Sequence, residues 1–360
     1  MKNHEKSLVF YAQVIPGAED IAVGEIEQVL GGEIRKIAKG VVVFRLDGPD
    51  PDVLELKTTE DVFLYAWGTD ALSFRAKDLE DIQKWTSQQP DWKHLLAVHQ
   101  QIREIPKGRP SFHVVTQMDG KHGYFRKDAQ KYFLRGLEKV IPSTWRQVEE
   151  NASAEFWLTI DGATAICGLR LSDRRMRHRE YKRAHRPASL RPSLAAGMVR
   201  LAELKPYHRV LDPMCGVGTL LAEYQNYAEQ WRVPRPPAIG GDLEMNAVRD
   251  AQANLRGLGA NHWFNWDATH LPLNGESIHR VICNPPFGKQ ISPGVNLPLF
   301  YSALVAEFYR VLLPQGKMVL LVSDHETLRG ACEKEHFHFE KKIKTKVLGQ
   351  TAFISVWKKR

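Results

Sequence analysis

The sequence predicts an α/β unit with an open, mostly parallel sheet in the C-terminal half, preceded by two smaller α+β units. From His208 onward, apolar runs typical of strands alternate with helical patterns, as they do in parallel sheets. The N-terminal half begins with a strand, a helix and two further strands, which is not the order of a doubly wound sheet. A chain of 360 residues with 43% hydrophobic content is long enough for two or three units with cores of their own.

The first α+β unit is expected over residues 1–60. Residues 8–15 have the composition of a strand, and a helical pattern follows that ends at Gly31-Gly32. Residues 34–46 are expected to form a hairpin that turns at Lys39-Gly40.

The second α+β unit is expected over residues 61–172. Its elements are a strand at 62–65, a helix after Leu79, a strand at 111–117, a helix at 127–140 and strands at 154–160 and 164–169. Asp161-Gly162 separates the last two strands and favours a hairpin turn.

Residues 173–192 are expected to form a basic linker. Its cations and those just before it are Arg170, Arg174, Arg175, Arg177, Arg179, Lys182, Arg183, Arg186 and Arg191. Arginines with Tyr181 and His185 interleaved suit phosphates and exposed bases, which favours contact with a nucleic acid. A solvated, charged linker is the alternative.

The α/β unit is expected over residues 193–360. After a helix at 194–204, strands are expected at 210–211, 238–242, 263–266, 280–283 and 318–322, helices at 218–229, 244–255 and 298–312, and an antiparallel pair at 337–346 and 353–357. Because ligands bind at the carboxyl ends of the strands in such sheets, we expect the functional site there.

A glycine-containing loop follows the first of these strands. Gly216 and Gly218 let the backbone turn sharply and approach a ligand without Cβ obstruction. The loop is not G-x-G-x-x-G and carries no Lys-Ser/Thr, so neither a dinucleotide nor a triphosphate is favoured.

Three acids stand at or near the ends of strands. Asp242 is placed to accept both ribose hydroxyls of a nucleoside cofactor. Asp267 can accept from an adenine amino group while the Ala268 N–H serves the ring, and Asp212 offers charge complementary to an amine and a sulfonium. Each acid alone could be a helix cap or a loop residue, but together with the glycine loop they indicate a cofactor site.

Asn284-Pro285-Pro286-Phe287 follows an apolar strand. The Asn284 side-chain oxygen and the Pro285 carbonyl can accept the two N–H groups of an exocyclic base amine, and Phe287 can stack on the base. The alternative is a strand-end turn in which the prolines merely stop pairing. Cys215 and Cys283 flank this region, and we interpret them as small buried side chains, not as catalytic thiolates.

These motifs, in this order, resemble those of the class I S-adenosylmethionine (SAM)-dependent methyltransferases over residues 190–360. The resemblance implies a seven-stranded, Rossmann-like sheet with its last strand antiparallel. It implies SAM as cofactor, bound by Asp212, Cys215, Gly216, Gly218, Thr219, Asp242, Leu243, Asp267, Ala268 and Asn284. The catalytic residues that it implies are Asn284, Pro285 and Phe287.

The N-terminal half resembles a ferredoxin-like module, in residues 11–29, and a THUMP domain, in residues 112–171. Together with Asn-Pro-Pro-aromatic, this arrangement resembles the tRNA guanosine-N2 methyltransferases that act on the sixth nucleotide of the acceptor stem. In that family the N-terminal modules bind the 3′ end of tRNA. The candidate RNA contacts are Lys121, His122, Arg126, Lys127, Arg175, Arg177, Arg179, Lys182, Arg183, Arg186 and Lys289.

The chain departs from the family pattern in two ways, since Phe287 stands where most relatives have Tyr and residues 85–101 form an unmatched insertion. A guanine-N2 methyltransferase of 23S ribosomal RNA, or an RNA-binding module without catalysis, are the alternatives. A branch that acts on the tenth tRNA nucleotide usually carries Asp at position 284, and N6-adenine DNA methyltransferases should lack the N-terminal modules.

Charge and cysteine usage agree with this expectation. A formal charge of +8 and a pI near 9.2 favour polyanionic partners. The four cysteines are far apart and form no C-x-x-C pair, which argues against a zinc site or a disulfide framework and for a reducing compartment. No apolar stretch approaches the ~18 residues of a membrane span. We therefore expect a cytoplasmic, metal-free, monomeric protein.

Overall fold

The computed structural model describes residues 7–103, 108–184, 186, 189–286 and 296–360. The contacts divide the chain into two compact units. Unit 1 comprises Met1–Gln13, Glu25–Leu56 and Asp61–Met176, and unit 2 comprises Val14–Gly24, Lys57–Glu60 and Arg177–Arg360. The domain boundaries expected near residues 60, 172 and 192 stay predictions. Among the described residues, no helix has the length and apolar character needed to cross a membrane.

Unit 1 is built on one eight-stranded sheet of order β2-β3-β1-β4-β8-β7-β5-β6. Its strands are β1 Leu8–Gln13, β2 Glu33–Ala38, β3 Val41–Leu46, β4 Asp61–Thr69, β5 Ser111–Asp119, β6 Arg146–Gln147, β7 Ala154–Asp161 and β8 Thr164–Arg170. The expected hairpins are present as β2–β3 and β7–β8. β4 pairs antiparallel with both β1 and β8, so it joins the strands expected in two separate units into a single sheet.

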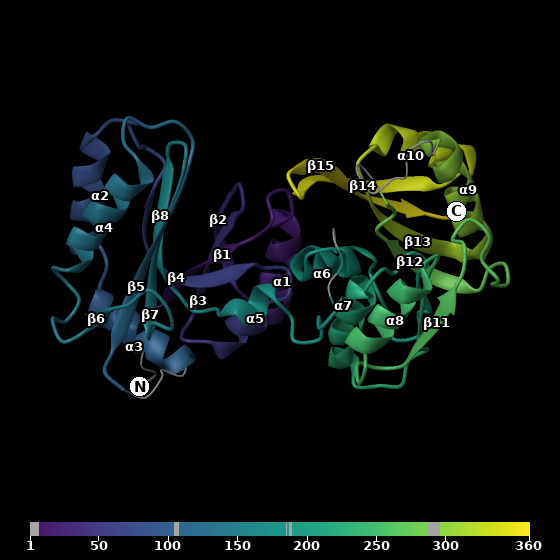
Figure 1. Ribbon diagram of the computed structural model, residues 1–360, viewed down its shortest axis with the longest axis horizontal. Helices are drawn as coiled ribbons and strands as arrows, with labels where there is room; N and C mark the ends of the chain where they lie inside the picture. Colours follow the sequence, from purple (N-terminus) through teal and green to yellow (C-terminus); the bar gives the residue numbers. More distant parts are fainter. Residues whose placement is uncertain (1–6, 104–107, 185, 187–188, 287–295) are drawn as a thin grey trace. The chain divides into compact units, whose positions relative to one another are not determined.

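Helices cover this sheet (Figure 1). They are α2 Lys77–Gln88, α3 Trp92–Ile102 and α4 Arg126–Leu137, with short helices η1 Pro51–Glu55 and α5 Arg174–Arg177. The stretch that the family pattern leaves unmatched, residues 85–101, forms the end of α2 and most of α3. Trp92 is buried there and donates its indole N–H to the Thr86 carbonyl at 2.7 Å, so this stretch is part of the core of unit 1.

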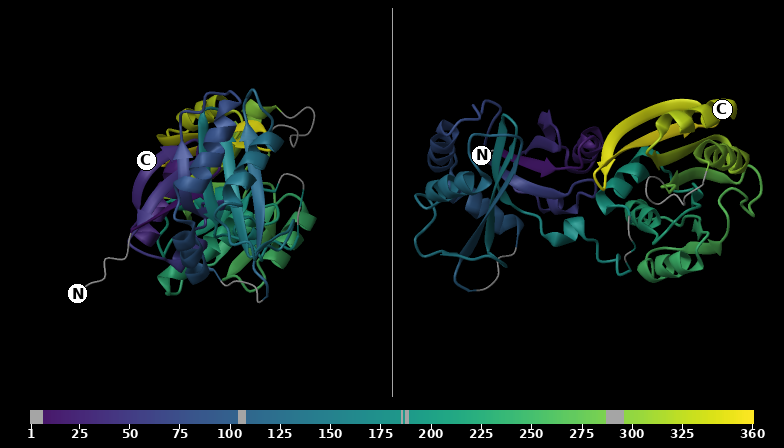
Figure 2. Two further views of the ribbon diagram at one scale, coloured as in Figure 1. Left: turned by 90° about the vertical axis from the view of Figure 1, so that its left-hand side faces the viewer. Right: turned by 45° about the horizontal axis from the view of Figure 1, so that its top comes forward.

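Unit 2 contains a seven-stranded sheet of order β11-β10-β9-β12-β13-β15-β14. The strands are β9 Val210–Asp212, β10 Ala238–Asp242, β11 Asn261–Asn265, β12 Ile278–Cys283, β13 Leu312–Val322, β14 His338–Val347 and β15 Gln350–Lys358. The first five are parallel, and β15 is antiparallel to both β13 and β14. This is a Rossmann-like arrangement, and β14 and β15 run as one long hairpin (Figure 2, right).

Both faces of this sheet are buried under helices. The helices are α6 Pro192–Leu201, α7 Thr219–Ala228, α8 Met245–Asn254, α9 Leu297–Val311 and α10 His325–Lys334, with the short η2 Glu229–Trp231. Along β12, Ile282 belongs to the core cluster of α6, α7 and α8, while Val281 and Cys283 belong to the cluster of α9 and α10. The strands alternate between two dry layers, which explains their nearly continuous apolar sequences.

Part of the N-terminal segment packs into unit 2. α1 spans Glu19–Leu30, and Ile15, Ala18 and Ile21 lie in the same core cluster as α6 and α7. A Cβ at Gly197 would lie 3.3 Å from the Ile21 side chain, so the glycine on α6 allows this approach. The sequence does not indicate this packing, because the apolar face of α1 carries no sign of which partner it will meet.

Candidate active site

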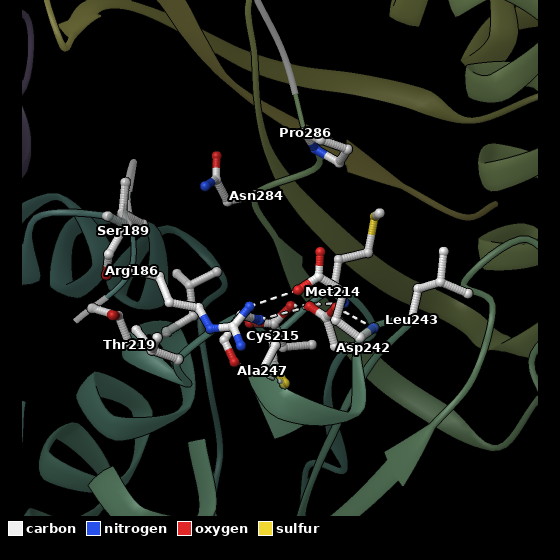
Figure 3. A pocket seen from close by; sticks show the side chains of 16 residues that line it. Arg186, Ser189, Met214, Cys215, Thr219, Asp242, Leu243, Ala247, Asn284 and Pro286 are labelled. Carbon is white, nitrogen blue, oxygen red and sulfur yellow. Dashed lines mark hydrogen bonds and ion pairs between the residues drawn. The ribbon is translucent and has the colours of Figure 1, made fainter. Parts of the chain in front are cut away.

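A cavity of about 400 Å³ opens at the carboxyl edge of the seven-stranded sheet. It is lined by Arg186, Ser189, Leu190, Asp212, Met214, Cys215, Gly216, Val217, Thr219, Leu220, Asp242, Leu243, Glu244, Ala247, Asn284 and Pro286. In Figure 3, Asn284 and Pro286 lie on one side and Arg186, Cys215 and Asp242 on the other. The acids and Asn284 stand at the ends of β9, β10 and β12, as expected for a parallel sheet, while other lining residues come from α7, α8 and the basic segment.

The glycine loop turns between β9 and α7. Gly216 and Gly218 have φ values of +53° and +80°, a region that glycine adopts without strain. Gly218 also has no room for a side chain, because a Cβ there would lie 2.6 Å from Leu255. The Cys215 N–H donates to the Gly241 carbonyl at 2.8 Å and fixes the loop to β10. Gly218 itself does not line the cavity.

Asp242 links the glycine loop to the start of α8. Its Oδ2 accepts the Gly216 N–H at 2.9 Å, and its Oδ1 accepts the Glu244 N–H at 3.0 Å. Both oxygens are therefore held in fixed directions at the wall of the cavity. The expected contact of this carboxylate with two ribose hydroxyls stays a prediction.

Asp212 is almost fully buried, with 1% of its surface exposed. Its Oδ1 accepts the Met214 N–H at 3.3 Å. Burial raises the pKa of this carboxyl well above its ordinary value, and the neighbouring charge of Asp242 adds to the increase. The Asp212 carboxylate thus lacks a compensating cation in the protein as described, and a cationic ligand in the cavity would stabilise its charged form.

Asn284 follows β12 directly. Its Oδ1 is buried, and in the described part of the chain it accepts no hydrogen bond. A buried carbonyl oxygen without a donor is unfavourable, so this atom is available to a ligand. Pro285 is buried, and Pro286 lines the cavity beside Asn284. Phe287 and Lys289, the expected stacking and phosphate residues, lie outside the described residues.

The two cysteines beside the site are not poised as nucleophiles. Burial raises the pKa of both thiols, Cys215 and Cys283, well above the ordinary value, and the charges of Asp212 and Asp242 raise it further. The thiolate, which is the reactive form, is therefore disfavoured at both positions. This agrees with their interpretation as small buried side chains.

The structure does not bring Asp267 and Ala268 into the cavity lining. Asp267 is exposed, and its Oδ1 accepts the Thr269 N–H at 2.9 Å and the Thr269 hydroxyl at 2.7 Å, bonds that lower the pKa of this carboxyl. Ala268 is buried in the cluster beneath α9. Their expected contacts to an adenine ring stay predictions.

The basic segment is bound to unit 2 by its own charges. Arg179 pairs with the buried Glu223 of α7 at 3.2 Å and donates to the Lys57 carbonyl at 2.8 Å. The Tyr181 hydroxyl donates to the same Glu223 oxygen at 2.6 Å. Lys182 donates to the Leu190 carbonyl at 2.7 Å. Arg179 and Lys182, two of the expected RNA contacts, thus have intramolecular partners, and their contact with RNA stays a prediction.

Asn254 connects this segment to the glycine loop. It is 3% exposed; its Oδ1 accepts the N–H groups of Arg183 and Ala184 at 2.9 and 2.7 Å, and its Nδ2 donates to the Val217 carbonyl at 3.0 Å. Arg186 then reaches α8, pairing with Asp250 at 2.6 Å and Glu244 at 2.7 Å. The segment consequently forms a wall of the cavity.

Several residues that line the cavity were not predicted from the sequence as cofactor contacts. They are Arg186, Ser189, Leu190, Met214, Val217, Leu220, Glu244, Ala247 and Pro286. Met214 and Val217 lie between motif residues and could have been inferred from the loop alone. The contributions of Arg186, Ser189 and Leu190 carry no sequence signal, since they depend on how the basic segment folds back onto α8.

The remaining expected RNA contacts lie at exposed or half-buried positions. Lys121 and Lys127 are exposed in unit 1, and the His122 ring stacks on Phe74 with centroids 5.0 Å apart. Arg126 donates to the Thr116 carbonyl at 3.3 Å. In the basic segment, Arg183 is exposed, Arg175 pairs with Asp173 at 2.9 Å, and Arg177 donates to the Glu60 carbonyl at 3.4 Å.

Residues 179–352 match the model of a protein family described as UPF0020, RMKL-like, methyltransferase domain. The cavity and the glycine loop both fall within this range. This part of the chain is therefore similar to the methyltransferase domains of that family.

Curated relatives share more of the chain. It is 27% identical over 326 residues to the tRNA (guanine(6)-N2)-methyltransferase of Thermus thermophilus, covering 89% of each protein. It is 30% identical to human tRNA (guanine(6)-N(2))-methyltransferase THUMP3 and 32% identical to mouse U6 snRNA (guanine-N(2))-methyltransferase THUMPD2. The matched stretches span only 42% and 34% of those two longer proteins, and 57% and 52% of this chain.

Solved structures show the same fold. TrmN from Thermus thermophilus superposes with a TM-score of 0.79 at 23% identity, and the match covers 98% of this chain and 100% of TrmN. SMU.472, solved in complex with SAH, superposes with a TM-score of 0.68 at 15% identity and 99% coverage of both chains. The likeness thus extends over unit 1 as well as over the methyltransferase domain.

The buried ion pair of Arg179 predicts a large loss of stability on truncation. Arg179→Ala would leave Glu223 buried without its cation, and we expect the free energy of unfolding to fall by about 3 kcal/mol in urea denaturation. Arg183→Ala, an exposed neighbour in the same segment, should change it by less than about 0.5 kcal/mol. Equal effects of both substitutions would contradict a structural role for Arg179.

The raised pKa of Asp212 predicts that the protein becomes less stable as pH rises. Above the ordinary Asp pKa of about 4, the unfolded chain has released the Asp212 proton while the folded protein still holds it. The free energy of unfolding therefore decreases as pH rises, by up to ~1.4 kcal/mol per pH unit, until the pKa of the folded state is reached. Asp212→Asn removes this decrease. Its free energy of unfolding relative to wild type should therefore be higher at pH 8 than at pH 5.

Asp267→Asn is the matched control for this measurement. The lowered pKa of Asp267 leaves its carboxylate ionised in both the folded and the unfolded protein between pH 5 and pH 8. The control should therefore show no pH-dependent difference from wild type in this range. If the free energies of unfolding of Asp212→Asn and wild type also differed by the same amount at pH 5 and pH 8, Asp212 would not be the cause of the pH dependence.

Proposed function

We propose that this protein is a SAM-dependent tRNA guanine-N2 methyltransferase that modifies a guanosine of the acceptor stem, at position 6. The observation that carries the proposal is the buried Asn284 Oδ1, which has no hydrogen-bond donor among the described residues. It lies beside Pro286 in the cavity that Asp212 and Asp242 also line. The Thermus and human relatives named for this reaction, together with the methyltransferase domain, support it.

The residues of the cavity fit SAM by charge and by shape. The Asp242 carboxylate would accept the ribose hydroxyls, and the turn at Gly216 leaves the backbone open to close approach. Asp212 would face the cationic part of the ligand, because no cation among the described residues compensates its buried carboxylate. Leu243, 72% exposed at the cavity rim, offers an apolar surface for a purine ring. When bound, SAM supplies an electrophilic methyl group.

Asn284 and Pro285 would orient the guanine amine for in-line attack. The N2 lone pair is conjugated with the ring, so acceptors for both of its N–H groups favour a pyramidal, more nucleophilic nitrogen. The Asn284 Oδ1 is one acceptor and the Pro285 carbonyl the other. Both also stabilise the positive charge that develops on nitrogen, and a preorganised group of this kind contributes ~10²–10³ in rate. Phe287 would stack on the base extruded from the stem.

We assign binding of the tRNA 3′ end to unit 1, as a ferredoxin-like and THUMP module. The exposed Lys121 and Lys127 and the adjoining His122 and Arg126 support this assignment, since they offer charge and a ring on one loop and helix start. The exposed Arg183 of the basic segment is a further candidate for backbone phosphate contact. The cytoplasmic location and monomeric state expected from the sequence belong to this proposal, and the four free, buried cysteines agree with a reducing compartment.

Two RNA classes compete with tRNA as the substrate. Mouse THUMPD2 is named for U6 snRNA, and the ribosomal alternative follows from the sequence analysis. The relatives described above are all named for the guanine-N2 reaction, although their RNAs differ. The chemistry is thus better supported than the choice of RNA.

Tritiated SAM tests the proposal directly. The protein is incubated with unmodified tRNA, ribosomal RNA or U6 snRNA, and the labelled nucleoside is identified by chromatography after digestion. We expect N2-methylguanosine at one acceptor-stem position of tRNA. Label in another RNA would change the substrate but keep the reaction, and no label in any RNA would favour a binding module without catalysis.

Asn284→Ala should lower the single-turnover rate of methyl transfer by roughly 10²–10³ and leave tRNA affinity largely unchanged. The reason is that the side chain acts on the amine and not on the phosphates that dominate binding. Rate is measured with limiting tRNA, and affinity by filter binding. Asn274→Ala, an exposed asparagine outside the cavity lining, is the matched control. Normal turnover by Asn284→Ala would refute the catalytic role.

A further inference from the structure

A second cavity, of about 620 Å³, lies in unit 2 at the opposite edge of the seven-stranded sheet. Tyr207 and His208 precede β9, His279 lies at the start of β12, and Lys317 lies in the first half of β13. Lys358 ends the antiparallel β15 and pairs in register with Lys317, which places it at the same edge. The length of β12 separates this cavity from the methyl-transfer site by roughly 15–20 Å.

One wall of this cavity is aromatic. The imidazole rings of His208 and His279 stack with centroids 5.1 Å apart at 25°. The Tyr207 ring packs edge-on against both imidazoles. Its centroid lies 4.8 Å from that of His208 with an interplanar angle of 85°, and 5.8 Å from that of His279 with an angle of 71°. Tyr207 nevertheless remains 59% exposed, so its side chain offers a supported apolar surface to a planar ligand.

The two histidines that line the cavity each have a fixed tautomer. The Nδ1 of His208 accepts the Lys205 N–H and the Nδ1 of His279 accepts the Arg209 N–H, each at 3.1 Å. Burial and the nearby Arg280 charge lower the pKa of both rings, that of His208 to about 3, so both are neutral at pH 7. A neutral imidazole whose Nδ1 accepts carries its proton on Nε2.

The cavity also has an excess of positive charge. Four cationic side chains line it, Lys205, Arg280, Lys317 and Lys358, against the two carboxylates Glu203 and Glu340. Lys317 is 7% exposed and pairs with both acids, at 2.6 and 2.7 Å. Arg280 is held by the carbonyls of Ala202 and His279 at 2.6 and 2.9 Å.

Lys205 and Lys358 remain available. Within the described ranges, neither ammonium group has a hydrogen-bond or ion-pair partner, and Lys205 is exposed. Both acids of the cavity pair with Lys317, and the four cations exceed the two acids by two charges. The free charge of the cavity is thus cationic and lies beside the aromatic wall. A ligand with a planar ring and an anionic group matches both features, whereas a simple anion would leave the exposed ring unused.

We propose that this cavity is a nucleotide-binding site, in which the base stacks on Tyr207 and a phosphate is held by Lys205 and Lys358. The Nε2–H groups of the two histidines add hydrogen-bond donors to the same ligand. The site is separate from the methyl-transfer cavity and goes beyond the proposed function. The nucleotide is either part of an RNA strand or a free mononucleotide, and these sources share the same chemistry.

The whole chain described above is tested with two probes. A fluorescein-labelled, unstructured RNA of about twelve nucleotides is titrated by anisotropy, and guanosine monophosphate is titrated by calorimetry. Tyr207→Ala should weaken binding about ten-fold, the typical effect of losing one stacked base. Tyr207→Phe keeps the ring and should bind like wild type. Lys205→Ala combined with Lys358→Ala should weaken binding and reduce its dependence on salt.

The matched control is Lys341→Ala combined with Lys346→Ala, because these exposed lysines of β14 do not line the cavity. Crosslinking of the same RNA containing 4-thiouridine, followed by peptide mapping, gives a readout that does not depend on a variant. We expect a crosslink in the peptide that contains Tyr207.

If the Tyr207→Ala protein loses affinity for the RNA alone, the ligand of the site is part of an RNA strand. If it loses affinity for guanosine monophosphate, the ligand is a free nucleotide. Unchanged affinity of the Tyr207→Ala protein for both probes, with no crosslink near Tyr207, would overturn the proposal. None of these measurements uses methyl transfer. A failed transferase assay would therefore leave this test intact, and a failed test here would not affect the proposed reaction.

Discussion

The parallel hydrogen-bond ladder of β10, β9, β12 and β13 is the constraint on which the rest of unit 2 depends. Because these strands run the same way, side chains from distant parts of the sequence meet at two edges. The carboxyl edge brings together Asp212, Asp242 and Asn284, and the amino edge brings together His208 and His279. Both faces of the sheet are closed by helices, so the edges are where its chemistry can occur.

The carboxyl edge was largely predictable from the sequence, because strand ends can be located from apolar runs. Asp242 and Asn284 follow such runs directly, and both line the cavity. Asp267 shows where this reasoning stops. β11 ends at Asn265, and Trp266 turns into the core and donates to the Pro213 carbonyl at 3.0 Å. The chain is already in a turn at Asp267, whose carboxylate caps the backbone at Thr269. A shift of a single residue at a strand end therefore decides whether a side chain lines this cavity.

Long-range pairing was much less predictable. A local pattern identifies β4 as a strand, but nothing in it specifies β1 and β8 as its two neighbours, and this pairing makes unit 1 one sheet. The basic segment presents the same difficulty in electrostatic form. The sequence shows how many cations the segment carries. It does not show that Arg179 pairs with an acid on α7 and Arg186 with acids on and just before α8. A dense run of charge therefore indicates a polyanion contact only after the internal partners of each cation are known.

The methyl-transfer cavity places stability and function in opposition at Asp212. Asp212 is 1% exposed and lies beside a second carboxylate, so its ionised form is unfavourable in the folded protein before ligand binds. In the function that we propose, the sulfonium of the methyl donor would favour the ionised form of Asp212, so donor binding would relieve this cost and stabilise the fold. After transfer the sulfur is neutral, so this part of the attraction would be lost while the proposed contacts at Asp242 remained. Asp212 would then favour the donor over the product by charge, which would promote exchange of one for the other at the site.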